Sequence, residues 1–361
     1  MKVGVLTFHN AYNYGAILQA YATQKLLENR GHDVEFIDYR NDAIDKSYKK
    51  FHFSWKNNPL RIIDKLLRSR YQLKKEKKID SFKKNHMVIS SKTYHKGEPV
   101  NAGLYDLVLI GSDQVWNPKL TGGLDDVYWG NLEVSDKTKI ISWAASSMYL
   151  SYSSSELSFI KESLLKFAYI SVREEALKKI VQGLTTQNVF KVVDPTFLLP
   201  MKQWAQLCHP VEEKNFVTVY AVRNRSETIR LAEKIANKMK KKLIVLRAHV
   251  QPIPQKNNKY TCGIEDFLSY IYSADFVVAS SFHGTVFSII FEKLFVNYTP
   301  SNTNDSRMTT ILKALGLKDR VVSDNSSLDV ITKQIDYSSV KRKLITMCEE
   351  SIQFLDMVVK Q

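Results

Sequence analysis

Residues 1–37 read MKVGVLTFHNAYNYGAILQAYATQKLLENRGHDVEFI. Within this stretch, residues 3–8 are apolar and predict a strand, and residues 16–29 carry apolar side chains at helical spacing. The helix is expected to stop before Gly31, and residues 34–37 predict a second strand. A strand, a helix and a second strand in succession imply a parallel pair joined by a right-handed crossover. The opening of the chain therefore predicts an α/β fold of the nucleotide-binding style.

The same alternation resumes after residue 100 and predicts a first lobe. The predicted strands lie at residues 107–110, 140–144, 169–172 and 189–193, and the predicted helices at residues 156–167 and 174–182. Asp194-Pro195 interrupts the pattern, because the residue before a proline is pushed out of the helical region. We assign residues 1–200 to this lobe, including a basic insert at about residues 46–100.

A second series with the same pattern predicts a second lobe at residues 201–338. Its predicted strands lie at residues 216–222, 243–246, 276–279 and 295–297, and its helices at residues 227–240, 265–273, 284–291 and 309–315. A terminal helix within residues 339–361 is long enough to cross back onto the first lobe. The expected fold class is α/β, with two Rossmann-like lobes of parallel strands and a ligand site in the cleft between them.

Length and composition limit the class of protein. The chain has 361 residues, more than one ordinary core holds, which agrees with two domains. The three cysteines, Cys208, Cys262 and Cys348, lie far apart and form no C-x-x-C pair, so neither a disulfide framework nor a zinc site is expected. No apolar run approaches the length of about 18 residues that spans a membrane, and the apolar start is too short for a signal sequence. We expect a soluble cytoplasmic protein without a metal.

The net charge of +15 is concentrated in one segment. Residues 46–84 contain fourteen Lys and Arg against three acidic residues, a net charge of +11. Aromatic side chains are interleaved with the basic ones: Phe51, Phe53, Trp55, Tyr71 and Phe82. This composition suits nucleic acid or an anionic membrane face, and it also suits a solvated helical insert. Nucleic acid is the weaker reading, because no RRM, KH or helix-turn-helix pattern accompanies the charge.

Two turns of the first lobe are candidate ligand sites, because ligands of parallel sheets bind beyond the carboxyl ends of the strands. The first turn contributes Asn10, Asn13 and Gly15. It lacks the G-x-G-x-x-G spacing of a dinucleotide site, and an Asn-capped helix start explains it equally well. The second turn contributes Ser112, Asp113, Gln114 and Trp116. Polar groups beside an aromatic ring suit sugar recognition, and a loop around a packed Trp is the alternative.

A third turn lies in the second lobe, between a predicted strand and a predicted helix. It contributes Ser280, Ser281, His283 and Gly284. A histidine at a helix N-terminus can bind an anion or act as an acid or base near neutral pH.

Arginines also follow several predicted strands. Arg173 comes one residue after the strand at 169–172, where its fork is suited to a carboxylate or phosphate, or to an ion pair with Glu174 or Glu175. Arg223 and Arg247 hold equivalent places in the second lobe.

Five motifs occur in order over about residues 1–320. They are NYGAILQAYA at 13–22, GSDQVW at 111–116, SVRE at 171–174, VDPT at 193–196 and SFHG at 281–284. In combination they resemble the polysaccharide pyruvyl transferase family. The resemblance implies a GT-B-like architecture and transfer of the enolpyruvyl group of phosphoenolpyruvate onto a sugar as a pyruvate ketal, without a cofactor.

The resemblance also implies roles for single residues. His283 matches the family's histidine and is the candidate acid or phosphate ligand, and Arg173 matches a donor-binding arginine. The sequence departs from the family motif at Ser281, where many members have Arg. The missing charge could come from Arg223, Arg247 or Arg307. Candidate bases are Asp113 and Asp194.

The same resemblance sets the expected biology. The first lobe would hold the acceptor, a lipid-linked oligosaccharide of bacterial capsule or exopolysaccharide assembly, and the second would hold phosphoenolpyruvate. The basic segment then favours peripheral contact with the inner membrane over nucleic acid. Two other functions stay open: a GT-B glycosyltransferase that uses a nucleotide sugar, and a non-catalytic homologue that binds glycans or anions.

Overall fold

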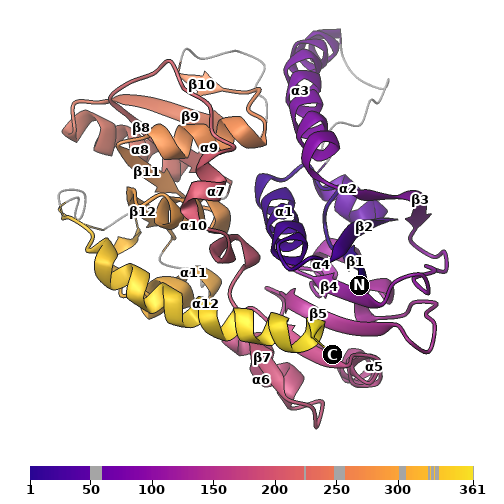
Figure 1. Cartoon of the computed structure of the whole chain (residues 1–361). Helices are drawn as coiled ribbons and strands as arrows, with labels where there is room; N and C mark the ends of the chain where they lie inside the picture. Colours follow the sequence, from indigo (N-terminus) through magenta and orange to yellow (C-terminus); the bar gives the residue numbers. More distant parts are fainter. Residues whose placement is uncertain are drawn as a thin grey trace. The chain divides into compact units, whose positions relative to one another are not determined.

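The computed structural model describes residues 1–48, 59–222, 225–247, 257–300, 306–323, 326, 329 and 333–360, apart from the side chains of residues 47, 48, 59–69, 306 and 307. Contacts within the chain divide it into two compact units. The first unit consists of Met1–Lys50, Lys83–Leu199 and Ile345–Gln361, and the second of Phe51–Phe82 and Pro200–Leu344. Figure 1 shows both units and the labels of their elements.

The first unit is built on a seven-stranded parallel sheet in the order β3-β2-β1-β4-β5-β6-β7. The strands are β1 (Lys2–Leu6), β2 (Asp33–Arg40), β3 (Ile89–His95), β4 (Leu107–Gly111), β5 (Lys139–Ala145), β6 (Tyr169–Val172) and β7 (Val189–Lys191). The order reverses between β1 and β4, whose carboxyl ends therefore flank the crevice in which such sheets bind ligands. The prediction missed β3, because this edge strand is mostly exposed and polar.

Helices cover the first sheet. They are α1 (Tyr14–Glu28), α2 (Asp42–Tyr48), α4 (Pro118–Thr121), η1 (Val127–Trp129), α5 (Ser154–Leu164), α6 (Glu175–Gln182) and η2 (Pro195–Leu198). The carboxyl-terminal part of α12 (Tyr337–Val359) also packs here: Phe354 stacks on Trp143 with ring centroids 6.1 Å apart, and Asp356 accepts a hydrogen bond of 2.7 Å from Arg30.

The second unit has a six-stranded parallel sheet in the order β10-β9-β8-β11-β12-β13. Its strands are β8 (Phe216–Ala221), β9 (Lys242–Arg247), β10 (Asn258–Lys259), β11 (Phe276–Ala279), β12 (Leu294–Tyr298) and β13 (Val321–Val322). Its helices are α3 (Pro59–His86, in part), α7 (Met201–Ala205), α8 (Arg225–Lys238), α9 (Ile264–Ser273), α10 (Phe282–Ile290), α11 (Ser306–Ala314) and η3 (Lys318–Arg320). Here the strand order reverses between β8 and β11.

Helix α3 holds most of the basic insert, which we predicted to belong wholly to the first lobe. Residues 51–82 group with the second unit instead. The reason lies in the contacts of α3: the Lys78 ammonium is 2.7 Å from the Asp266 carboxylate, and Lys75 donates to the carbonyl oxygen of Arg247 at 3.3 Å. Basic side chains therefore attach the helix to this unit.

Lys75 is buried although it is a lysine, with an exposed fraction of 4%. Burial lowers the pKa of its amine from the ordinary 10.5 to about 8. The unfolded chain therefore binds more protons than the folded chain between about pH 8 and 10.5, and the free energy of unfolding should rise with pH across this window.

Replacing Lys75 with Met should raise the free energy of unfolding at pH 7 by about 1–2 kcal/mol, because a charge no longer has to be buried. It should also remove the rise between about pH 8 and 10.5. Urea unfolding at a series of pH values measures both effects, with exposed Lys74→Met as the control. A variant less stable than wild type at pH 7 would contradict this account of Lys75.

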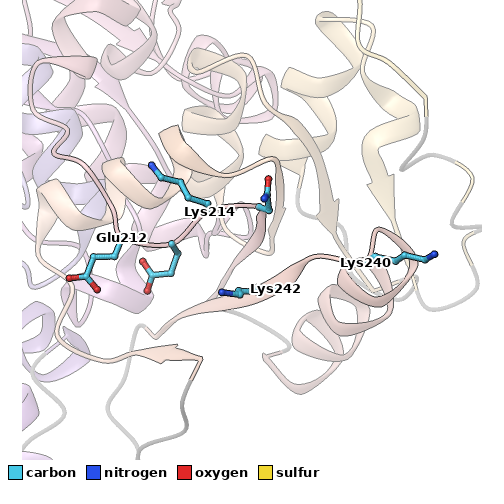
Figure 2. Close-up of a pocket in the computed structure, with 6 residues that line it drawn as sticks. Glu212, Lys214, Lys240 and Lys242 are labelled. Carbon is cyan, nitrogen blue, oxygen red and sulfur yellow. The ribbon is translucent and has the colours of Figure 1, made fainter.

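An open hollow of the second unit lies at the opposite edge of the sheet from the predicted site. Figure 2 shows its lining residues: Glu212, Glu213, Lys214, Asn215, Lys240 and Lys242. Asn215 immediately precedes β8 and Lys242 begins β9, so the hollow opens at the amino ends of these parallel strands. Ligands of parallel sheets bind at the carboxyl ends, so this hollow is not a candidate site.

Candidate functional site

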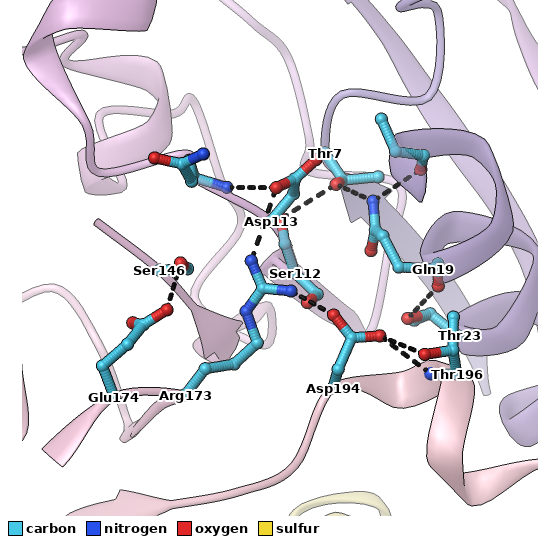
Figure 3. Close-up of polar contacts among 12 residues, drawn as sticks. Thr7, Gln19, Thr23, Ser112, Asp113, Ser146, Arg173, Glu174, Asp194 and Thr196 are labelled. Atoms are coloured by element: carbon cyan, nitrogen blue, oxygen red, sulfur yellow. Dashed lines mark hydrogen bonds and ion pairs between the residues drawn. The ribbon is translucent and has the colours of Figure 1, made fainter. Parts of the chain in front are cut away.

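At the reversal point of the first sheet, the ends of β1 and β4 are joined by a short chain of hydrogen bonds. The Thr7 hydroxyl donates to the carbonyl oxygen of Ser112 at 3.1 Å, and the Gln19 amide donates to the Thr7 hydroxyl at 2.8 Å. All three residues are buried. Figure 3 shows them beside Asp113 and Arg173. The second turn predicted from the sequence therefore lies at the reversal point.

The backbone after β4 turns sharply, and this turn positions Asp113. Gly111 has φ +126°, and a Cβ there would lie 2.1 Å from the carbonyl oxygen of Trp143, so only glycine fits. The peptide bond from Gly111 to Ser112 is cis. Asp113 itself has φ 66°, a left-handed conformation that Asp adopts more readily than most residues.

Arg173 is the centre of a buried ionic cluster. Its side chain is 4% exposed, and its guanidinium pairs with the carboxylates of Asp194 and, at 3.4 Å, Asp113. Asp194 also accepts hydrogen bonds from the backbone and the hydroxyl of Thr196 at 3.0 and 2.6 Å. Burial opposes the charge of Arg173, but the carboxylates of Asp194, Glu174 and Asp113 raise its pKa.

This arrangement corrects the predicted role of Arg173. We predicted a fork directed at the donor, with an exposed ion pair as the alternative. The guanidinium is instead buried and committed to two carboxylates of its own unit, 60 and 21 residues away in sequence. Its neighbour Glu174 is also buried and accepts a hydrogen bond of 2.5 Å from Ser146. Arg173 therefore orients the carboxylates of Asp113 and Asp194. With Glu174 beside them, carboxylates outnumber cations in this cluster.

The two carboxylate oxygens of Asp113 differ in their hydrogen bonds. Its Oδ1 accepts from the backbone of Gln114 at 2.9 Å and from Arg173. Among the residues that the structure describes, no hydrogen bond reaches Oδ2. The side chain is 10% exposed. A carboxylate pinned through one oxygen by a cation, with the other oxygen open, is suited to accept a proton from a substrate hydroxyl.

The predicted sugar-stacking role of Trp116 is wrong. The side chain is completely buried and stacks on Trp129 with ring centroids 4.3 Å apart, while its indole N–H donates to the carbonyl oxygen of Tyr128 at 2.9 Å. Both ring faces are therefore unavailable to a sugar. Gln114 is buried too, and its side-chain oxygen accepts from Asn117 at 2.7 Å. The packed-Trp alternative describes this loop.

The first predicted turn, which contributes Asn10, Asn13 and Gly15, leads into helix α1. Asn13 caps the helix by accepting from the backbone of Ala16 at 3.2 Å, and Gly15 is a buried residue of its first turn. Asn10 accepts a hydrogen bond of 3.3 Å from Lys83 and lines a small hollow. Of these three residues, Asn10 is the one that the structure places beside open space.

A buried group that the sequence pattern did not single out lies next to this hollow. The ring nitrogens of His9 lie 3.1 Å from the carbonyl oxygen of Thr7 and 3.1 Å from the carboxylate of Asp38. Asp38 also accepts from Arg40 at 2.6 Å and Thr93 at 2.7 Å. Although burial acts in the other direction, the hydrogen bonds from His9, Arg40 and Thr93 lower the pKa of Asp38. The position of His9 in the turn that follows β1 was the available signal.

In the second unit, the turn from Ser280 to Gly284 lies where the strand order reverses. The backbone of Ser280 donates to the carbonyl oxygen of Tyr220 in β8 at 3.2 Å. The Ser281 hydroxyl caps α10 by accepting from the backbone of Gly284 at 3.1 Å. A Cβ at position 284 would lie 2.7 Å from the Ser281 hydroxyl, so this cap requires a glycine at position 284. His283 is half-buried in the first turn of α10.

Two arginines lie at the carboxyl ends of β8 and β9: Arg225 in the segment after β8, and Arg247 as the last residue of β9. Arg225 donates to the carbonyl oxygen of Val222 at 3.2 Å, and Arg247 donates to Asn258 at 2.8 Å. Burial and then the charge of Arg247 lower the pKa of Arg225, so the two guanidiniums repel each other. An anion would relieve this repulsion. We predicted a role for Arg247 but missed Arg225, and Arg223 and the side chain of Arg307 lie outside the described residues.

Solved structures that match the chain include UDP-GlcNAc 2-epimerases and glycosyltransferases. Over the whole of both chains, the protein is similar to UDP-GlcNAc 2-epimerase from Neisseria meningitidis, at 11% identity and a TM-score of 0.51. The corresponding enzyme from Methanocaldococcus jannaschii gives 12% identity, full coverage of both chains and a TM-score of 0.49. The glycosyltransferase SnogD from Streptomyces nogalater gives 9% identity, 97% and 95% coverage, and a TM-score of 0.42. The predicted class, two parallel-sheet α/β domains of GT-B-like type, is confirmed.

The family follows from the sequence itself. A family model described as polysaccharide pyruvyl transferase matches residues 13–302. The chain belongs to this family. No curated protein matches it. Within the described residues, no helix is long and apolar enough to cross a membrane, and no group of three or more His, Cys, Asp or Glu could hold a metal ion.

Proposed function

We propose that the protein transfers the enolpyruvyl group of phosphoenolpyruvate onto a sugar of a surface polysaccharide precursor, forming a pyruvate ketal and releasing phosphate. The observation that carries the proposal is Asp113, a carboxylate held at the reversal point of the first sheet with one oxygen open. Membership of the polysaccharide pyruvyl transferase family supports the reaction class.

The second unit supplies features that suit the donor. Phosphoenolpyruvate carries a carboxylate and a phosphate, both of which favour a helix N-terminus and guanidinium groups. The N-terminus of α10, with His283 in its first turn, and the mutually repelling pair Arg225 and Arg247 offer such groups. Ser281 caps the helix and brings no charge, so we assign the cationic role to the two arginines.

The reaction needs one acid and one base. We assign the acid to His283, which would protonate the methylene carbon of phosphoenolpyruvate and make C2 electrophilic. A sugar hydroxyl adds to C2 and gives its proton to Asp113. Phosphate then leaves with the electrons of its C–O bond, and a second hydroxyl of the same sugar closes the ketal. The two sugar hydroxyls release two protons. One restores the proton that His283 gave to the methylene carbon, and the other leaves with the phosphate.

The test is acceptor-dependent phosphate release by the purified protein, given phosphoenolpyruvate and a panel of free and lipid-linked oligosaccharides. Phosphate should appear only when an acceptor is present. His283→Ala should lower the rate by about 10²–10⁴-fold through the loss of the general acid, whereas His209→Ala, a change at a half-exposed histidine of the same unit, should leave it unchanged.

Two results would overturn the proposal. One is the absence of acceptor-dependent phosphate release across the panel. The other is calorimetric binding of UDP- or GDP-sugars without binding of phosphoenolpyruvate, which would favour a nucleotide-sugar transferase of the same fold. Binding of oligosaccharides without any turnover would instead indicate a non-catalytic glycan-binding protein.

A further inference from the structure

Helix α3 carries a basic face that the proposed reaction does not use. From Arg70 to His86, where its side chains are described, four exposed basic residues and one exposed apolar residue form what we call the cationic stripe: Arg70, Leu73, Lys74, Lys77 and Lys84. At 3.6 residues per turn these basic positions fall within about 80° of arc and extend over roughly 20 Å of helix. They form one continuous face.

The opposite side of the helix is packed, so the orientation of the stripe is fixed. Ile79 and Phe82 are completely buried, and Lys75 is buried as well. Lys78, at the margin of the stripe, is held by Asp266 at 2.7 Å. These contacts leave the stripe as the solvent-facing side of α3.

Acidic side chains neutralise only part of the charge of the stripe. Residues 70–86 contain two, Glu76 and Asp80. Glu76 accepts a hydrogen bond of 2.8 Å from Gln72 on the flank of the helix, and Asp80 lies at the margin of the stripe. Leu73, which is 55% exposed, is an apolar side chain among the cations.

We propose that the cationic stripe docks the protein on an anionic lipid bilayer. Basic residues on one face of a helix are attracted to negatively charged headgroups by about 1 kcal/mol each, and an apolar side chain among them can enter the interfacial layer. Nucleic acid fits this face less well. Three of the four basic residues are lysines, which lack the forked geometry that arginine offers to phosphates. The apolar side chain of Leu73 would also lie against a charged phosphate backbone. The docking does not depend on the proposed reaction.

The experiment is co-sedimentation of the full chain with vesicles of phosphatidylcholine, alone or mixed with phosphatidylglycerol. Wild type should bind the mixed vesicles far better than the neutral ones, and added salt should weaken this binding. The double variant K74Q/K77Q, which removes two charges, should lose about 30-fold in partitioning onto mixed vesicles. The matched control is R230Q/K234Q, which removes two exposed charges from α8 of the second unit.

Thermal unfolding checks that both variants fold like wild type. Equal partitioning of K74Q/K77Q and R230Q/K234Q would overturn the proposal, and so would equal binding of wild type to both kinds of vesicle. A third contrary result is binding to polyuridylate or duplex DNA that K74Q/K77Q weakens while vesicle binding stays the same, which would assign the stripe to nucleic acid.

Discussion

Replacing Arg173 with methionine should lower the free energy of unfolding by about 3–5 kcal/mol. The methionine fills a similar volume but leaves the carboxylates of Asp194 and Asp113 without their cation in a buried setting. Removing one partner of a buried ion pair costs much more than the pair itself contributes, because the remaining charge stays desolvated. Urea unfolding at neutral pH measures the change.

A matched control lies in the same unit. The ion pair of Lys191 with Glu175 has an N–O distance of 3.3 Å, but both side chains are exposed, at 39% and 48%. Lys191→Met should therefore cost less than about 1 kcal/mol. In the double variant R173M/D194N, part of the loss should be recovered, because the carboxylate that lacked a partner is gone. Equal destabilisation by R173M and Lys191→Met would show that the cluster is not a buried ionic centre.

Asp113→Asn should lower acceptor-dependent turnover by about 10²–10⁴-fold while the protein stays folded. The amide oxygen of Asn can still accept from the backbone of Gln114, so the loop geometry is kept. An amide cannot take the proton of a sugar hydroxyl, so the base is lost. The rate of phosphate release from phosphoenolpyruvate, measured at saturating acceptor, gives the effect.

Two further variants separate catalysis from stability. Asp106→Asn changes an exposed aspartate of the same unit and should leave turnover unchanged. Asp194→Asn should lower the free energy of unfolding more than Asp113→Asn does, because Asp194 is the more deeply buried partner of Arg173. If Asp113→Asn retained the turnover of Asp106→Asn, the assignment of Asp113 as the base would be wrong.

The sequence was sufficient to predict the central strands of both sheets and the turns that follow them. Apolar runs marked the central strands, and a parallel sheet places every following turn at one edge. The polar edge strand β3 gave no such signal. The reversal points needed the strand order, which one sequence does not contain, and they lie at the turns of Ser112 and Ser280.

Side-chain partners were harder to predict than positions. Arg173 was correctly placed after a strand, but the carboxylates it contacts come from distant parts of the chain. Trp116 was placed in the right loop, yet whether a ring packs inward or faces a ligand depends on neighbours such as Trp129 that spacing does not identify. Arg225 and His9 were missed, although both lie in turns that follow strands, because their partners appear only in the folded chain.

The carboxyl-terminal helix has a consequence for how the protein is made. In the first unit, Phe354 packs against Trp143, and Ser351 accepts a hydrogen bond of 3.0 Å from the backbone of Val193. During synthesis on the ribosome, most of that unit emerges early, but these late residues emerge only after the second unit has been translated. The rest of the first unit must therefore wait, with an unfilled surface around Trp143, until residues 351–354 have left the exit tunnel.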